Sequence, residues 1–312
     1  SEMCIRDSTK PPYNMEIEPY NPVIKDGKVY GRGSLDAKAQ LTAFAFALLA
    51  IHRADVPLSG DLLFVGAAGE EWDSVGSRYI AKYGPKTDMA IVGEPTKLDV
   101  CVAHKGGINV TLTTLGRSAH SSMPHLGVNA VAKMGKLIMA IEEELPKKLS
   151  VDRHPLLGVS THSLGVISGG MQPTVVPDKC TLTLDIRTVS KKIEESIPQF
   201  FEEILNSIKA KDPDFNAEFS MRVRISPVDT KPDHPLVNAL KRSILEVTGK
   251  EAKIVGAPYG TDAAHLVRGG IASVICGPGD IAYAHSPVEF VPIDEVVKAA
   301  EIFTLTALEI CK

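Results

Sequence analysis

The chain has 312 residues, of which 44% are hydrophobic and 23% charged, and its formal net charge at pH 7 is −4. This length permits a large buried core and favours two domains over one. The small negative charge gives no indication of a nucleic-acid or anionic-membrane partner, and the composition is typical of a soluble globular protein. We therefore expect neither a nucleic-acid partner nor a membrane span.

Five cysteines are scattered through the chain, mostly within apolar runs: Cys4, Cys101, Cys180, Cys276 and Cys311. Their odd number and wide spacing predict buried free thiols, not a disulfide framework or a thiolate zinc site. Free thiols are typical of a reducing compartment, so we predict a cytoplasmic protein. The first eight residues, SEMCIRDS, lack the features of a signal peptide and resemble a translated sequencing-adapter sequence. We expect residues 1–8 to be foreign and the native start to be missing.

The first part of the chain predicts a helix and short buried strands. After the glycine turns at 31–33, residues with helical spacing form one apolar face: Leu41, Phe44, Ala45, Leu48 and Leu49. Three continuous apolar runs, at 61–68, 88–93 and 271–277, fit strands covered on both faces, as in parallel sheets. Helical patterns between such runs indicate an α/β layer.

From about residue 106 the pattern changes. Alternating strands are predicted at 107–116, 162–170, 179–188 and 217–225, with amphipathic helices at 129–145 and 191–210. The order β-α-β-β-α-β predicts a ferredoxin-like sandwich. After Pro227 the α/β character returns, with helices near 235–248 and from Asp294. The predicted fold class is an α/β catalytic domain with a mixed sheet (1–105 and 226–312) and an inserted ferredoxin-like α+β domain (106–225).

Metal-type ligands follow the three predicted buried strands. Glu70 and Glu71 follow the first, Glu94 follows the second, and His285 lies a short loop after the third. In open α/β sheets, ligands bind outside the carboxyl ends of the strands. Asp36 would be the fifth member of the group. Four carboxylates and one imidazole would repel without cations, and this donor mix suits zinc, cobalt or manganese.

Each of these residues also has an ordinary structural explanation. Asp36 could cap a helix, Glu94 could be a solvated loop residue, and His285 could be a surface histidine. The pair Glu70 and Glu71 could begin a helix. Their joint placement favours a metal site over four separate coincidences.

Five motifs together resemble the di-zinc amidohydrolases of the aminoacylase, acetylornithine deacetylase and succinyl-diaminopimelate desuccinylase group. The motifs are YGRGSLDAK, GEEWDSVG, VGEPT, GRSAHSSMPHLGVNAV and GPGDIAYAHSPVEFV, in the family's order between about residues 20 and 292. The resemblance implies a zinc-hydrolase catalytic domain, an inserted dimerisation domain and a homodimer. It also implies hydrolysis of an amide bond in a small N-acyl amino acid or peptide substrate.

The resemblance assigns roles within the catalytic domain. Asp36 matches the carboxylate that bridges two divalent metals, most often zinc, with cobalt and manganese as alternatives. Glu71 and His285 match ligands of one metal, and Glu94 matches a ligand of the other. Glu70 matches the general base that accepts the proton of the attacking water.

Further roles are implied around the substrate. His120 matches a histidine of the inserted domain that reaches the active site of a partner subunit and stabilises the oxyanion. Arg187 matches a contact to the substrate carboxylate. The consecutive residues Gly260, Thr261 and Asp262 match a loop near the substrate.

The chain also departs from the family pattern. The family has a histidine-x-aspartate motif roughly thirty residues before the bridging aspartate, and its histidine binds metal. That position falls in the SEMCIRDS segment, which contains no histidine. We therefore expect a truncated chain with an impaired site, in which one metal is weakened. Thr174 also stands where the family often has asparagine.

Three other functions are considered. A metallo-carboxypeptidase or dipeptidase of the same superfamily would share the motifs. A non-catalytic relative that binds amino acids would have no need of Glu70 as a base. A zinc aminopeptidase is disfavoured by the long inserted unit. The helix at 129–145 could form a dimer face, although an amphipathic helix is more often packed against its own core.

Overall fold

The computed structural model describes residues 15, 16 and 18–312, and it divides into two compact units. Unit 1 comprises the chain up to Ala103 together with Val228–Ala257 and Thr261–Lys312, and unit 2 comprises His104–Pro227 with Pro258–Gly260. The sequence places the domain boundaries after residues 105 and 225. The expectations for residues 1–8 and for Cys4 lie outside the described residues.

The main sheet of unit 1 is mixed, as the sequence predicts. It has the order β11-β4-β13-β3, and β12 pairs with β4. β13 runs parallel to β3 and antiparallel to β4. Two of the three predicted buried strands are therefore present. β4, whose residues are all buried, is not predicted from the sequence. The strands are β3 (Met89–Val92), β4 (Val100–His104), β11 (Val228–Asp229), β12 (Ile254–Ala257) and β13 (Ala272–Ile275).

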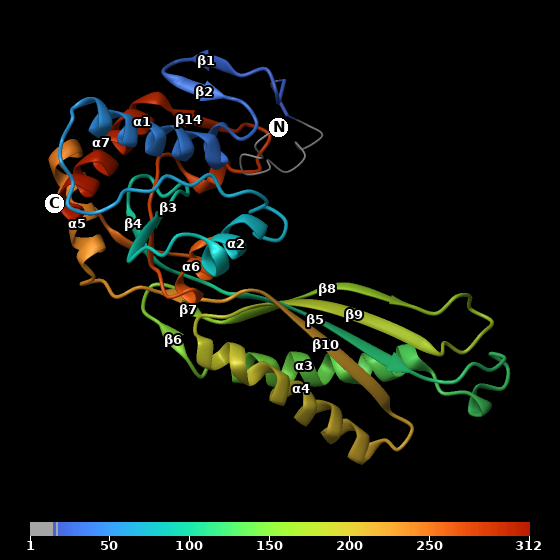
Figure 1. The fold of residues 1–312 in the computed structure, drawn as a ribbon. Coiled ribbons are helices and arrows are strands. Elements are labelled where there is room, and N and C mark those ends of the chain that lie inside the picture. The colour runs from blue at the N-terminus through green and yellow to red at the C-terminus, as the bar shows by residue number, and fades with distance from the viewer. Residues whose placement is uncertain (1–14, 17) are drawn as a thin grey trace. The chain divides into compact units, whose positions relative to one another are not determined.

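A second, antiparallel sheet of unit 1 joins segments from the two ends of the described chain. Its order is β1-β2-β14, from β1 (Val23–Lys25), β2 (Lys28–Tyr30) and β14 (Phe290–Pro292). In the register of β2 and β14, Phe290 lies opposite Tyr30. This pairing brings the loop that follows β2 next to the loop that precedes β14 (Figure 1).

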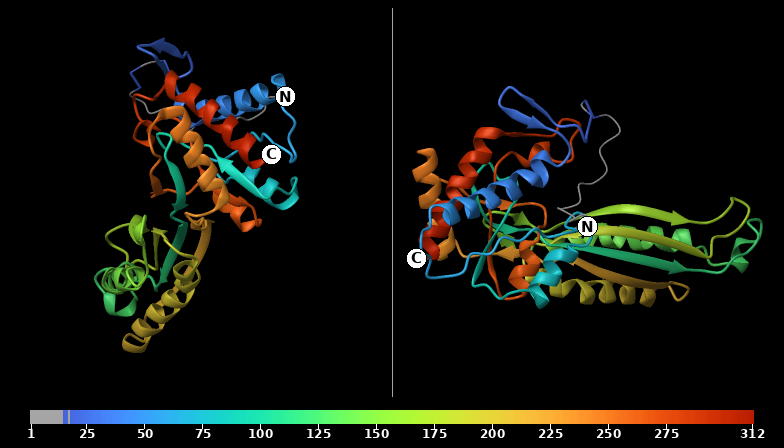
Figure 2. Two further views of the ribbon diagram at one scale, coloured as in Figure 1. Left: turned by 90° about the vertical axis from the view of Figure 1, so that its left-hand side faces the viewer. Right: turned by 45° about the horizontal axis from the view of Figure 1, so that its top comes forward.

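Helices flank the sheets of unit 1. They are α1 (Ala39–Arg53), α2 (Val75–Tyr83), α5 (Pro235–Thr248), α6 (Ala263–Arg268) and α7 (Ile293–Ile310). α1 and α7 lie side by side in the views of Figures 1 and 2, and the rings of Phe44 and Phe303 stack with centroids 4.2 Å apart.

The buried face of α1 differs from the predicted one. It consists mainly of small residues: Ala39, Gln40, Ala43, Ala47 and Ile51. The larger residues predicted to form the buried face are only half-buried. α1 packs closely on the end of β3, because a Cβ added to Gly93 would lie 2.7 Å from the Cβ of Gln40 and 2.8 Å from the ring of Phe44. The absence of a side chain at Gly93 permits this approach.

The predicted strand at 61–68 is wrong. No strand is assigned there, and Leu63, Phe64 and Val65 are 47%, 42% and 45% exposed. A continuous apolar run indicates burial, but a strand also needs a neighbour that completes its backbone hydrogen bonds. Within the described part of the chain, no segment pairs with this one.

One stretch bears on the expectation that the chain has no membrane span. The stretch Ser34–Arg53 is long and apolar enough to meet the length and composition criteria for a span, with a hydropathy of 1.3 and 39% of the window buried. One such stretch is weak evidence, because core helices meet the same criteria.

Unit 2 has the predicted ferredoxin-like order. It runs β5 (Gly107–Leu115), α3 (Ala130–Leu149), β8 (Thr161–Gly169), β9 (Lys179–Arg187), α4 (Lys191–Lys211) and β10 (Asn216–Ile225), and a small hairpin joins β6 (Arg153–His154) to β7 (Gly158–Val159). The four long strands form an antiparallel sheet of order β10-β5-β9-β8. Both helices cover one face of this sheet (Figures 1 and 2). Alternate strand residues and one stripe of each helix form the core, which includes Leu112, Leu137, Leu184 and Phe201.

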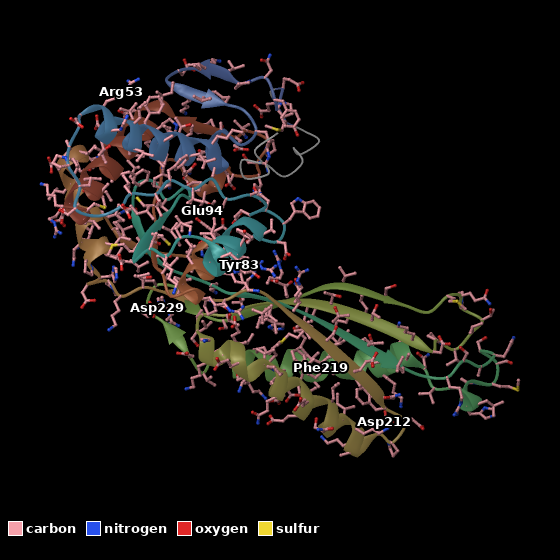
Figure 3. The ribbon with its side chains drawn as sticks, viewed as in Figure 1. Arg53, Tyr83, Glu94, Asp212, Phe219 and Asp229 are labelled. Atoms are coloured by element: carbon pink, nitrogen blue, oxygen red, sulfur yellow. The ribbon has the colours of Figure 1, made fainter. Side chains whose placement is uncertain are left out.

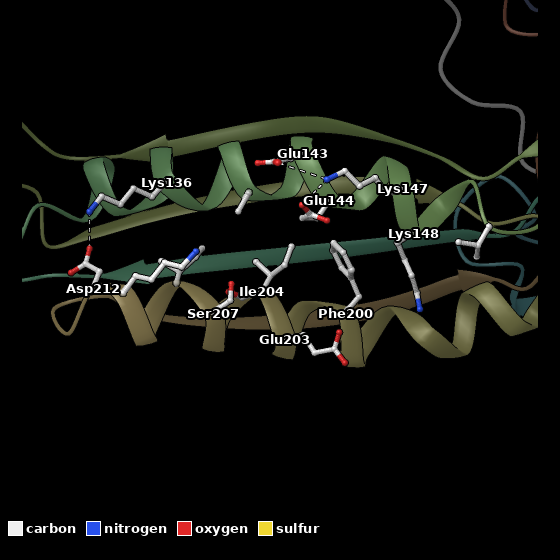
Figure 4. A pocket seen from close by; sticks show the side chains of 14 residues that line it. Lys136, Glu143, Glu144, Lys147, Lys148, Phe200, Glu203, Ile204, Ser207 and Asp212 are labelled. Carbon is white, nitrogen blue, oxygen red and sulfur yellow. Dashed lines mark hydrogen bonds and ion pairs between the residues drawn. The ribbon is translucent and has the colours of Figure 1, made fainter.

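A groove of about 810 Å³ runs between α3 and α4 (Figure 4). Its floor includes Phe200 and Ile204, and its rims carry lysines and carboxylates. At one end, Nζ of Lys133 and Nζ of Lys136 donate to Asp212 at 2.7 and 2.8 Å. These two ion pairs join the beginning of α3 to the end of α4.

Candidate metal centre

Three predicted ligands from distant parts of unit 1 meet at one point. Nε2 of His285 lies 3.2 Å from Oδ2 of Asp36 and 3.1 Å from Oε1 of Glu71. Among the described residues, these three donor atoms form a cluster within 4.8 Å of one another. The side chains of Asp36 and Glu71 are 10% and 8% exposed, and that of His285 is 48% exposed. The cluster is therefore open to solvent on the side of the histidine.

Each ligand lies in a loop or turn that directly precedes a helix or a strand, which fixes the position of the loop. Asp36 lies in a tight turn, Ser34–Lys38, immediately before α1, and the peptide bond between Asp36 and Ala37 is cis. Glu71 lies in the turn before α2, and His285 lies between the short turn Ile281–Tyr283 and β14. His285 itself has a left-handed φ of 57°. Such a φ is uncommon outside glycine, so the surrounding contacts must hold it.

The ordinary explanations for these residues do not hold. The residue before α1 is Lys38, which gives no side-chain cap, and Asp36 has extended φ and ψ angles of −121° and 91°. Glu70 and Glu71 precede the first turn of α2, which begins at Val75. His285 is exposed, but both carboxylates contact it.

Hydrogen bonds that the His285 ring donates to the two carboxylates raise its pKa to about 10. Asp36 contributes most, Glu71 contributes next, and partial burial opposes them. The imidazolium therefore offsets one of the two negative charges of the carboxylates. A divalent cation at this point would offset both charges, with the neutral ring as a ligand.

The donor set fits one divalent metal. Zinc binds both imidazole nitrogen and carboxylate oxygen, and catalytic zinc sites use three protein ligands and keep a further position for water or substrate. Cobalt and manganese accept the same donors. The mixture of nitrogen and oxygen donors is less suited to calcium or magnesium, which prefer oxygen alone.

Glu94 and Glu70 lie outside this cluster of three. Glu94 lies two residues after the end of β3, belongs to unit 1 and is only 3% exposed, and Figure 3 labels it there. A carboxylate so deeply buried needs compensating partners. Glu70 is half-buried in the turn beside Glu71. Their roles as a second-metal ligand and as a base stay predictions.

Two residues of the predicted substrate loop are held within unit 1. Thr261 is fully buried, and its hydroxyl accepts from the backbone of Ala263 at 3.2 Å. Asp262 is 6% exposed, and its Oδ1 accepts from Oγ of Ser77 at 2.6 Å. Ser77 lies in the first turn of α2, so this bond ties the start of α2 to the start of α6. The substrate role of both loop residues stays a prediction.

The remaining predicted residues belong to unit 2. The backbone amide of Ser122 donates to Nδ1 of His120 at 3.2 Å, so a neutral ring carries its proton on Nε2. His120 is exposed, and its Nε2–H is the donor that an oxyanion would need. Nε of Arg187 donates to Asp185 at 2.6 Å. Gly260 lies close to Ile225, because an added Cβ would be 2.5 Å from it.

The sequence analysis does not identify two buried residues next to the cluster, Arg32 and Glu289. They are 5% and 0% exposed, and Nη1 of Arg32 donates to Oε2 of Glu289 at 2.8 Å. Both stand inside the motifs YGRGSLDAK and GPGDIAYAHSPVEFV. The motifs therefore contain both residues, but neither residue matches a metal ligand, a base or a substrate contact of the family.

Comparison with known sequences finds one family. A model of peptidase family M20/M25/M40 matches residues 9–309. An acetylornithine deacetylase from Myxococcus xanthus is 28% identical over 292 residues, covering 92% of this chain and 74% of the relative. A probable succinyl-diaminopimelate desuccinylase from Staphylococcus epidermidis is 27% identical over 317 residues, covering 91% of this chain and 76% of the relative.

Comparison with solved structures finds the same fold. Aminopeptidase PepT from Bacillus cereus matches with a TM-score of 0.77 at 23% identity, over 94% of this chain and 76% of that chain. The YXEP protein of Bacillus subtilis, a dinuclear metal-binding peptidase of the M20 family, matches with a TM-score of 0.68 at 17% identity, over 86% and 70%. At these identities the structures support the fold alone.

Glu71→Gln should lower the pKa of His285 in the metal-free protein from about 10 towards its ordinary value of 6.5. One of the two carboxylates that stabilise the imidazolium is lost, so the proton is held less tightly. NMR titration of the His285 ring measures this. Asp280→Asn is the control, because Asp280 in the preceding turn pairs with Lys97 at 2.7 Å instead. A pKa near 10 in Glu71→Gln would contradict the geometry.

Proposed function

We propose that this chain, which belongs to peptidase family M20/M25/M40, hydrolyses the amide bond of a small N-acyl amino acid. The match confirms the resemblance inferred from the motifs, and metal-dependent amide hydrolysis is the reaction class of its named relatives. The observation that carries the proposal is the cluster of Asp36, Glu71 and His285, with Glu70 beside it in the chain.

The choice of an N-acyl amino acid is supported by the relatives. Two relatives that match most of this chain are named as an acetylornithine deacetylase and a probable succinyl-diaminopimelate desuccinylase. A solved structure with the same fold is a metallo-carboxypeptidase, so a carboxypeptidase or dipeptidase is the alternative.

The proposed mechanism assigns separate tasks to the residues. A divalent metal at the cluster, with zinc as the first choice, would lower the pKa of water and polarise the substrate carbonyl. Glu70 accepts a proton from the attacking water and passes it to the leaving amine. His120 of the partner subunit would donate a hydrogen bond from its Nε2–H to the developing oxyanion. Arg187 binds the substrate carboxylate.

We extend the proposal to a second metal, which would share Asp36 and take Glu94 as a ligand. Glu71, whose side chain contacts His285, binds metal in this proposal, and its neighbour Glu70 in the same turn faces the water.

The proposal includes a homodimer formed through unit 2. β8 is an edge strand of its sheet, and it exposes Val166 and Ile167 by 67% and 56%. An exposed apolar edge strand is a ready site for pairing with a second strand. We also propose a cytoplasmic location, because Cys101, Cys180 and Cys276 are buried free thiols. Cell fractionation tests this location.

Glu70→Gln should reduce turnover about 10²- to 10⁴-fold, because the general base is lost while the shape of the side chain remains. Metal content, measured after dialysis, should stay equal to that of the unmodified chain. Asp73→Asn is the control, since this exposed carboxylate of the same turn pairs with Arg78 at 2.8 Å. Unchanged turnover would refute the base role, and loss of metal would make Glu70 a ligand.

A substrate panel tests the reaction itself. The zinc-loaded chain should release free amine from N-acetyl or N-succinyl amino acids faster than from dipeptides. The comparison uses kcat/KM, because this ratio reports discrimination between substrates. Preference for dipeptides would favour the peptidase alternative. Binding of the substrates without hydrolysis would favour an amino-acid-binding protein.

Sedimentation equilibrium tests the homodimer. The chain should sediment as two copies, and Val166→Lys should shift it towards one copy, because a charge on the edge strand opposes pairing. Val297→Lys is the control, since Val297 is similarly exposed, at 52%, on α7 of unit 1. A single copy for the unmodified chain would refute the proposal.

A further inference from the structure

A buried ion pair lies next to the cluster of Asp36, Glu71 and His285, because Glu289 of the pair contacts the backbone of Asp36. The side chains of Arg32 and Glu289 are 1% and 0% exposed, and they come from opposite ends of unit 1, 257 residues apart. Removing a carboxylate from water costs several kcal/mol unless partners satisfy it fully. Such a residue is unusual in a core, so its contacts indicate what it does.

Glu289 uses its two oxygens for different purposes. Oε2 accepts from Arg32, whereas Oε1 accepts from the backbone amides of Leu35 and Asp36, at 3.1 Å each. One carboxylate therefore fixes the backbone of the residue whose own carboxylate contacts His285. Leu35 is fully buried and packs with Ala39 and Val291, so this segment is held from two sides.

The same residue fixes the segment that carries His285. Glu289 follows His285 by four positions, and its backbone carbonyl accepts from Gly31 at 3.2 Å. Between them, the hydroxyl of Ser286 donates to the carbonyls of Tyr283 and Val288 at 2.9 Å each. His285 contacts the side chain of Asp36, and Glu289 contacts its backbone amide. These two contacts join the segment that carries Asp36 to the segment that carries His285.

We propose that Glu289, oriented by Arg32, is a positioning residue that sets the separation of the donor atoms of Asp36 and His285. Its own oxygens are all turned to Arg32 and to backbone amides, so it acts through these two residues. The positioning stands on the contacts alone, and only its effect on metal binding rests on the proposed function.

The alternative is a purely structural ion pair, and the two explanations differ in what they predict. A structural pair would affect the stability of the whole unit. A positioning pair would also affect the local backbone at Leu35 and Asp36, together with the metal affinity. Hydrogen exchange at these two amides, measured by NMR, separates the two explanations.

Glu289→Asp is the decisive variant. It keeps the charge opposite Arg32, so no buried cation is left unpaired, but it shortens the side chain by about 1.5 Å. The shorter carboxylate cannot reach Arg32 and both amides together. We expect faster exchange at Leu35 and Asp36 and about 10- to 100-fold weaker Zn²⁺ binding, measured by competition with a chelator.

Asp212→Asn is the matched control in unit 2. It removes a carboxylate that accepts from Lys133 and Lys136, far along the chain from the cluster. Figure 3 labels Asp212, and Figure 4 draws its contact with Lys136. The variant should lower the melting temperature without changing exchange at Leu35 and Asp36 or the Zn²⁺ affinity. Equal effects of Asp212→Asn and Glu289→Asp on these readouts would overturn the proposal.

Other outcomes are also decisive. A folded Glu289→Asp with unchanged exchange at Leu35 and Asp36 overturns the positioning. If the unmodified chain binds no Zn²⁺, the proposed metal centre fails, and the exchange result still decides the positioning. If Glu289→Asp does not fold, Arg32→Lys replaces it. It should show the same two changes to a smaller degree, because one ammonium orients the carboxylate less rigidly than a guanidinium, and its failure to show them overturns the proposal.

Discussion

The charge balance among buried carboxylates is the constraint on which the architecture of unit 1 depends. Asp36, Glu71, Glu94 and Glu289 are all largely removed from water, and each needs a cation or hydrogen-bond donors. Arg32 and two backbone amides satisfy Glu289, and the imidazolium of His285 offsets one of the two charges of Asp36 and Glu71. Loops from both ends of the unit must therefore converge, and the β2–β14 pairing brings them together.

In unit 1, the predicted metal ligands are different residues from those that fix the position of the ligand loops. Loops carry the donors, while a small antiparallel sheet and the beginnings of helices fix those loops. Ser77 and Asp262 join the starts of α2 and α6, and Glu289 joins the start of α1 to β14. Such buried polar contacts specify one geometry because each partner would otherwise be left unsatisfied. This arrangement is consistent with a site that must keep ligands at fixed distances.

Sequence patterns predicted the parts of the fold that depend on local periodicity. The helices and strands of unit 2 follow from alternation and helical spacing, and the ferredoxin-like order follows from their sequence. The motifs located Asp36, Glu71 and His285, although no single residue was diagnostic. Periodicity failed where tertiary partners decide the outcome. The buried face of α1 includes Gln40, which packs against Gly93, and residues 61–68 have no pairing strand among the described residues. Arg32 and Glu289 were missed because an ion pair between distant residues has no local pattern.

The segment at 61–68 has a practical consequence for handling the protein. Proteases bind their substrates as single extended strands, and they cleave exposed segments that pair with nothing. Leu63, Phe64 and Val65 offer large apolar side chains in such a segment, between α1 and the turn that carries Glu70 and Glu71. A protease with apolar specificity would therefore have a cleavage site in this segment. The nick would sever Asp36 from Glu71 in the chain while leaving the helices on both sides intact.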